Sequence, residues 1–253
     1  MKHFFTLLSH EIRMLLVNAS TYIAATLFLG FMGFIFTSIL ETFSKIPRES
    51  SPAEDFFHVF WFPVLFMVPM LTMKCLAEER RLGTIETLLT TPVTTTEVVL
   101  AKYSAAYFMY LALWGSTAAF FFILKKFSGD VRLLDPGPLI GGYLFIAISG
   151  LLFIALGVLA SSLSRNQAVA AILCATMIFG VIFGLSWLAG SSALNREVLQ
   201  PVRVAVDYAQ VLVHRDDFTR GIVDTRQLLF YLSGTVLALI FSILGVEAKL
   251  LHS

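Results

Sequence analysis

The sequence predicts an all-α integral membrane protein with six transmembrane helices. Of its 253 residues, 57% are hydrophobic and 14% are charged, and its mean hydropathy is +0.82. Such a composition is typical of membrane proteins and not of soluble domains. Six apolar stretches approach the roughly 20 helical residues that a hydrocarbon core requires. They lie at about 21–40, 56–73, 103–124, 139–160, 168–188 and 228–246.

The residues before the first span predict a helix that lies flat on the membrane surface. Apolar residues recur there at helical intervals, with charged residues between them. The apolar positions are Phe4, Leu7, Leu8, Ile12, Leu15 and Leu16, and the charged ones are Lys2, Glu11 and Arg13. This pattern is typical of amphipathic interfacial helices. The segment does not resemble a cleavable signal peptide, so we expect it to stay in the mature protein.

Helix-start signals precede most of the other spans. In a capping box, Ser or Thr is followed three residues later by Glu or Gln, and the pair satisfies free backbone amides. The pairs are Ser51 with Glu54, Thr94 with Glu97, and Ser164 with Gln167; Asp224 with Gln227 is an Asp-led version, and Asp135 precedes Pro136 before the fourth span. Their positions support the division into six spans independently of hydropathy.

Prolines and glycines mark three of the spans. Pro63 and Pro69 are expected to kink the second span, and a fixed kink is favoured over a gating hinge. The fourth span carries small residues that permit close helix approach, namely Gly141, Gly142, Gly150 and Gly157. In the fifth span, Gly180 and Gly184 have the spacing of a dimerisation motif, although packing within one subunit explains them at least as well.

The densest group of charges lies in "LAEERRLGTIETLLTTP", residues 76–92, between the second and third spans. Its apolar residues Leu82, Ile85, Leu88 and Leu89 recur at spacings of three and four, and Glu79, Arg80, Glu86 and Thr87 fall on the other face. This periodicity predicts a short amphipathic helix on the same side of the membrane as both termini. Periodicity alone is equally consistent with an interfacial helix whose charges are solvated and with a helix that docks on a partner protein.

Several function classes are excluded or disfavoured. The net charge of +1 provides no basic surface for nucleic acid, and no Gly-rich phosphate-binding motif is present. The middles of the spans contain no Asp, Glu, Lys or Arg and no paired nucleophile and base, which disfavours an ion-coupled carrier or an intramembrane enzyme. His58 is better explained as a structural residue than as a proton-coupling group. We therefore expect no catalytic residues and no cofactor.

The long segment at about 189–224 has no clean helical or strand periodicity. It could form short helices that cap one mouth of a translocation path, or a platform for a partner. Asp207, His214, Asp216 and Asp217 could suggest a metal site, but carboxylates spaced this loosely are usually solvated charges. We therefore expect no metal.

The stretch "AEERRLGTIETLLTTPVTTTEVVLAKY" resembles a segment of the type 2 ATP-binding-cassette (ABC) permease family. The matching positions are Glu79, Gly83, Thr84, Glu86, Leu88, Pro92 and Lys102. Ala101 departs from the family pattern, where Gly commonly precedes the Lys. Within the long loop, "DDFTRGIVDTRQLLFYLS" is similar to the gliding-motility and copper-enzyme-maturation branch of that family.

The resemblance implies that residues 1–253 form a single permease domain, the transmembrane subunit of an ATP-driven exporter that performs no chemistry itself. It implies a second permease subunit, in a homodimer or heterodimer, and a separate cytoplasmic ABC ATPase bound through a coupling helix at about 78–91. The expected docking residues are Glu78, Glu79, Arg80, Arg81, Gly83, Thr84, Glu86, Leu88 and Pro92. Charge counting leaves the orientation open, but the resemblance places the protein in the cytoplasmic membrane, with both termini in the cytoplasm and the loop at 189–224 outside.

Two alternatives remain open at this point. The chain could be a membrane module that transmits ATPase-driven motion to an extracytoplasmic machine without moving a solute. If it is an exporter, its apolar and aromatic spans suit lipids, glycans or peptides about equally.

Overall fold

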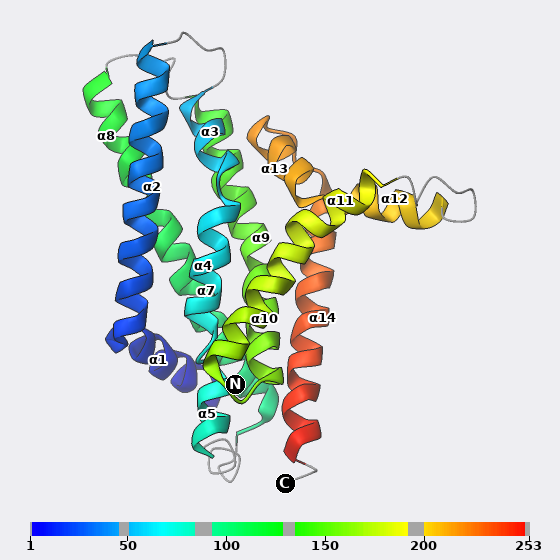
Figure 1. The fold of residues 1–253 in the computed structure, drawn as a ribbon. Coiled ribbons are helices and arrows are strands. Elements are labelled where there is room, and N and C mark those ends of the chain that lie inside the picture. Colours follow the sequence, from blue (N-terminus) through cyan, green and yellow to red (C-terminus); the bar gives the residue numbers. More distant parts are fainter. Residues whose placement is uncertain (1, 46–50, 84–92, 129–134, 192–199, 251–253) are drawn as a thin grey trace.

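The computed structural model describes residues 2–45, 51–83, 93–128, 135–191 and 200–250, and the regular elements in these ranges are helices (Figure 1). In chain order they are α1 (Lys2–Val17), α2 (Ala19–Lys45), α3 (Pro52–His58), α4 (Trp61–Thr72), α5 (Ala77–Leu82), α7 (Thr95–Ser116), α8 (Ala118–Ser128), α9 (Pro136–Leu163), α10 (Gln167–Phe179), a π-helical turn (Gly180–Gly184), α11 (Leu185–Ala189), α12 (Gln200–Tyr208), α13 (Val211–Thr219) and α14 (Thr225–Leu250). The predicted all-α fold is confirmed.

Six helical segments of the described residues are long and apolar enough to cross a membrane. They are Ala19–Lys45, Trp61–Leu82, Thr95–Phe127, Pro136–Leu163, Gln167–Ala189 and Thr225–Ala248. One end of the bundle carries α1, α5 and the end of α14, and we call it the terminal face; the other end, the opposite face, carries α3, α12 and α13 (Figure 1). The prediction of six spanning helices is confirmed.

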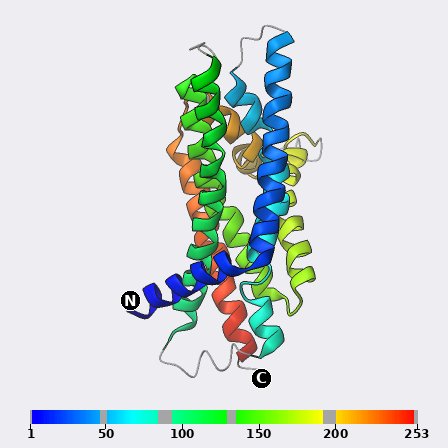
Figure 2. The ribbon, with the colours of Figure 1, turned by 90° about the vertical axis from the view of Figure 1, so that its left-hand side faces the viewer.

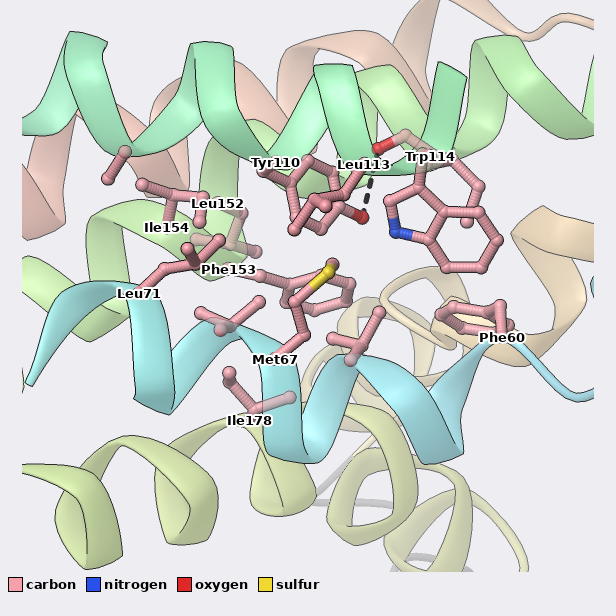
Figure 3. Packing of buried hydrophobic residues seen from close by; sticks show 14 of the residues in the cluster. Phe60, Met67, Leu71, Tyr110, Leu113, Trp114, Leu152, Phe153, Ile154 and Ile178 are labelled. Carbon is pink, nitrogen blue, oxygen red and sulfur yellow. Dashed lines mark hydrogen bonds between the residues drawn. The ribbon is translucent and has the colours of Figure 1, made fainter. Parts of the chain in front are cut away.

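The central element of the bundle is α9, which contacts α4, α7, α10, α13 and α14. Its glycines leave room for these neighbours: Phe57 lies against Gly142, Tyr110 against Gly150 and Thr72 against Gly157. The close helix approach predicted from these residues is therefore confirmed within the subunit. Large side chains fill the surrounding interior, including Phe60, Met67, Tyr110, Trp114 and Phe153 (Figure 3).

Most of the predicted helix starts are formed as expected. Thr94 and Glu97 make a complete capping box at α7. The other three cap residues accept from backbone amides: Ser51 from Glu54, Asp135 from Gly137, and Asp224 from Arg226. The prediction of a capping box formed by Ser164 and Gln167 is wrong. Asn166 caps α10 instead by accepting from the Ala168 amide at 2.9 Å, and Ser164 lies at the end of α9.

The second and third predicted spans contain breaks. The segment expected at 56–73 is divided between α3 and α4 at residues 59–60, shortly before Pro63. Pro63 has no amide to donate to the carbonyl four residues earlier, so one continuous helix loses a hydrogen bond there. The segment expected at 103–124 is divided between α7 and α8 at Thr117, whose buried hydroxyl donates to the Trp114 carbonyl at 2.6 Å.

The fifth span changes direction where its two glycines lie. Residues Gly180–Gly184 form the π-helical turn, and beyond it α11 leads away from the bundle (Figure 1). A Cβ on either glycine would meet no atom within 4 Å. Neither glycine therefore serves close packing within this subunit.

The N-terminal helix α1 lies across the terminal face, transverse to the spans (Figure 2). It packs against α7 and meets α2 at Asn18. Its Met14 and Val17 side chains are exposed. This arrangement agrees with the interfacial helix predicted from its sequence.

Candidate functional site

The described part of the predicted docking segment is the short helix α5, which is fixed to α9 at its start. The hydroxyl of Ser161 accepts hydrogen bonds from the backbone amides of Leu76 and Ala77, both at 3.0 Å. These are amides that the first turn of a helix cannot satisfy internally. A side chain of a neighbouring span therefore positions the first turn of α5.

Helix α5 ends at Leu82, and Gly83 follows it with a φ of 69°. This left-handed conformation is easy for glycine and closes a helix C-terminus. The continuous helix predicted over 78–91 is thus interrupted at Gly83, because periodicity does not register a left-handed cap. The predicted docking residues Thr84, Glu86, Leu88 and Pro92 lie outside the described residues.

A buried ionic cluster joins α5 to two other helices. The Nζ of Lys102 on α7 lies 2.7 Å from Oε1 of Glu79 on α5 and 2.7 Å from Oε1 of Glu11 on α1. The Lys102 side chain is only 6% exposed, and each carboxylate is 21% exposed. In so little water the attraction is weakly screened, so the three residues hold α1, α5 and α7 together.

Arg80 connects α5 to two further spans by hydrogen bonds. Its guanidinium donates to the carbonyl of Ser162 on α9 and, at 2.9 Å, to the carbonyl of Gly245 on α14. Ser162 belongs to the last turn of α9, where carbonyls have no partner within the helix and a cation is favoured. Arg80 is therefore an internal connector, although its place on the polar face predicted a surface residue.

The other two charges of α5 remain at the surface. Arg81 Nη2 lies 3.9 Å from Glu78 Oε1, and the two side chains are 58% and 34% exposed. A pair this exposed contributes little to stability. The structure thus separates the four predicted docking charges into an inward pair, Glu79 and Arg80, and an outward pair, Glu78 and Arg81.

Periodicity gave no role to Glu11 or Lys102, although the sequence contains a signal for both. Glu11 lies four residues from Leu7 and from Leu15, within the apolar stripe of its helix. Lys102 similarly falls between Val98 and Ala106. A charge within an apolar stripe needs a buried partner. What the sequence does not show is that these two charges meet each other.

On the opposite face, the charged residues of the long loop join helices together. Arg215 on α13 donates to the His58 carbonyl at 3.1 Å and to Asp216. The Gln227 amide of α14 donates to Asp217 at 2.7 Å. Within the described ranges, no group of three His, Cys, Asp or Glu side chains is arranged to hold a metal ion.

His214 is the buried centre of this region. Its Nε2 lies 2.8 Å from the Tyr208 carbonyl and its Nδ1 lies 3.1 Å from the Tyr231 hydroxyl. Because a carbonyl only accepts, Nε2 carries the proton, and neutral Nδ1 accepts from Tyr231. Burial lowers the pKa of His214 below its usual 6.5, outweighing the opposite effects of the Tyr208 carbonyl, Asp217 and Asp224.

This pKa shift predicts that stability depends on pH. With a lowered pKa, the neutral histidine stabilises the fold fully above pH 6.5, and that contribution is lost as pH falls through the folded-state value. We expect the unfolding temperature of the purified protein to fall below pH 6.5, and the decrease to be smaller in His214→Gln. Replacement of the exposed His58 by Gln is the matched control and should keep the wild-type pH dependence. Equal slopes in wild type and His214→Gln would contradict the assignment.

The six apolar spans, with surface helices fixed to them by buried ion pairs, define a multi-pass membrane protein whose polar contacts gather at its two faces. The family model described as "ABC-2 family transporter protein" matches residues 45–203, and the chain belongs to this family. It is accordingly a permease subunit of an ABC transporter, and the family works with an ABC ATPase subunit. A comparison with curated proteins finds no match.

Proposed function

We propose that this permease serves an ATP-driven exporter and that α5 begins the coupling helix on which its ATPase docks. In this proposal the terminal face, with both chain ends, lies in the cytoplasm, and α12 and α13 lie outside. The main support is the attachment of α5 to three spans: Glu79 pairs with Lys102 of α7, and Arg80 binds carbonyls of α9 and α14. A partner that displaces α5 would move these spans together.

The inward and outward charges of α5 would then have separate tasks. Arg81 is exposed and Glu78 is partly exposed, so both can meet a soluble partner, whereas Glu79 and Arg80 transmit the displacement into the bundle. Gly83 terminates the helix through its left-handed backbone conformation. Thr84, Glu86, Leu88 and Pro92 remain part of the proposed docking segment through the family resemblance.

Reversing the outward charge is expected to weaken ATPase binding without disturbing the fold. We expect Arg81→Glu to reduce recovery of the ATPase about tenfold, because a like-charge contact replaces an attractive one at the interface. The measurement is affinity purification of the full-length protein from its native membrane in mild detergent, followed by quantitative mass spectrometry of the ATPase recovered with it. The unfolding temperature of the variant should match that of the wild type.

The matched control is Arg203→Glu, which reverses a partly exposed arginine on the opposite face. It should leave ATPase recovery unchanged. Normal recovery with Arg81→Glu, or an equal loss with Arg203→Glu, would contradict docking at α5. Glu79→Arg is less suitable for this experiment, because it would place a second cation beside Lys102 and disturb the bundle itself.

A second permease subunit, identical or similar, completes the proposed exporter in the cytoplasmic membrane. The likeness of the segment from Asp216 onward supports the gliding-motility and copper-enzyme-maturation branch. The alternative function, transmission of motion to an extracytoplasmic machine, is favoured by α12, which projects from the bundle and has no buried residue (Figure 1). A phenotype that requires α12, with no detectable solute transport, would select this alternative.

A further inference from the structure

A cavity of about 480 Å³ lies under α1 on the terminal face, bounded by α1, the α4–α5 segment and α7. This volume is within the range of small-molecule sites. Its walls combine charged groups with apolar side chains, and neither the ion pairs of the bundle nor the proposed docking surface accounts for the space between them.

One wall of the cavity presents a cation. Lys74 lines the cavity, and its Nζ lies 3.2 Å from Asn18 Oδ1 and 2.8 Å from Ser20 Oγ. Both of these partners are neutral. The ammonium is thus held in position by two acceptors that leave its charge uncompensated, which suits it to bind a phosphate.

The other wall carries carboxylates. Glu11 and Glu79 each have an Oε1 atom 2.7 Å from the Nζ of Lys102, so two carboxylates lie beside this lysine. Glu78 also lines the cavity, and its nearest cationic partner is Arg81 at 3.9 Å. An ammonium group that donates hydrogen bonds would be favoured on this side.

Apolar side chains complete the cavity and extend from it. Met14, Val17 and Leu71 line it, and Met14 and Val17 are 56% and 75% exposed. Because α1 is an interfacial helix across the ends of the spans, these side chains lie where lipid glycerol and upper acyl chains are found. A free headgroup in solution has no glycerol or acyl carbons to pack against these apolar side chains.

We propose that the cavity binds the headgroup of a zwitterionic aminophospholipid of the phosphatidylethanolamine class. Its phosphate contacts Lys74, its ammonium contacts the Glu78 and Glu79 side, and its glycerol and acyl carbons pack on Met14, Val17 and Leu71. A phosphatidylcholine headgroup fits less well, because its quaternary ammonium donates no N–H hydrogen bond to a carboxylate. A phosphatidylglycerol headgroup also fits less well, because it carries a net negative charge and has no ammonium group to contact the carboxylates.

The test measures lipid binding to the full-length, delipidated protein by native mass spectrometry. Dioleoyl phosphatidylethanolamine, dioleoyl phosphatidylcholine and dioleoyl phosphatidylglycerol are titrated separately. The ethanolamine lipid is expected to bind about tenfold more tightly than the other two, and Lys74→Gln to weaken it about tenfold, the effect of losing one charge-assisted hydrogen bond. Glu78→Gln should reduce the preference for ethanolamine over choline, because it removes one carboxylate that favours the ammonium.

Lys45→Gln is the control, since it removes an exposed lysine at the far end of α2. It should bind all three lipids as the wild type does. Equal binding of the three lipids, or an affinity for the ethanolamine lipid that is unchanged in Lys74→Gln, would overturn the proposal. A soluble headgroup is tested with phosphoethanolamine: displacement of the bound lipid at equimolar concentration would assign the site to a soluble ligand and overturn the lipid assignment. Unfolding temperatures near that of the wild type would show that the variants are folded.

Discussion

Replacing Lys102 by methionine is expected to destabilise the protein by about 3 to 5 kcal/mol, the usual cost of removing one partner from a buried ionic group. The change would leave the Glu11 and Glu79 carboxylates facing each other, each only 21% exposed and without the cation 2.7 Å away that holds them. Methionine fills a similar volume, so the effect would come from charge and not from a cavity. The measurement is thermal unfolding of the purified variant in detergent.

A control variant and a compensating triple variant test whether the loss of stability comes from the buried charge. Lys45→Met removes a lysine whose ion pair with Glu41 is exposed on both sides, and it should change stability by no more than about 0.5 kcal/mol. Combining Lys102→Met with Glu11→Gln and Glu79→Gln should restore much of the lost stability, because the two side chains that faced Lys102 are then neutral. An unfolding temperature for Lys102→Met equal to that of Lys45→Met would refute the ionic connection of the three helices.

Gly141→Ala is the second change with a large expected effect. A Cβ at this position would lie 1.8 Å from the backbone oxygen of Phe218, the closest approach at any described glycine. Backbone cannot rotate away as a flexible side chain can, so α13 or α9 would have to move. We expect a destabilisation of about 3 kcal/mol, at the upper end of the usual cost of overpacking.

The readouts are the unfolding temperature and the rate of proteolysis within α13, which should both show the displacement. Gly30→Ala is the matched control, because its Cβ would meet no atom within 4 Å. Alanine also has the higher helix propensity, so Gly30→Ala should be neutral or stabilise by several tenths of a kcal/mol. Similar unfolding temperatures for the two variants would show that α13 is not packed against Gly141.

Local sequence features predicted the spans and most of their starts because their signals are short-range. Hydropathy over about 20 residues identifies a span, and a cap depends on two or three neighbouring residues, as at Thr94 and Glu97. The Ser164 cap was misplaced by two residues because Asn166 offers an equally good side-chain acceptor. Breaks such as the one at Thr117 leave composition unchanged, so hydropathy does not detect them.

The candidate site was only partly predictable, for a different reason. Periodicity found the charged face of residues 76–92 but assigned all of its charges to the surface. Glu79 turns inward because Lys102 lies 2.7 Å away, and Lys102 is 23 positions further along the chain. Arg80 turns inward because the ends of α9 and α14 present carbonyls to it. A helical wheel shows only the residues of one segment, so it shows neither Lys102 nor the carbonyls of α9 and α14.

The sequence by itself determined the all-α class, the six spans, the N-terminal helix that precedes them and the location of the charged segment. These follow from composition and local periodicity, because the residues of a segment decide by themselves whether it is more stable in lipid, at the interface or in water. Only the tertiary structure decided which charges of α5 are buried, that Glu11 shares Lys102 with Glu79, and that a cavity with charged and apolar walls lies beneath α1. Those outcomes depend on contacts between segments far apart in the chain, whose electrostatic and packing energies exist only once the helices have assembled.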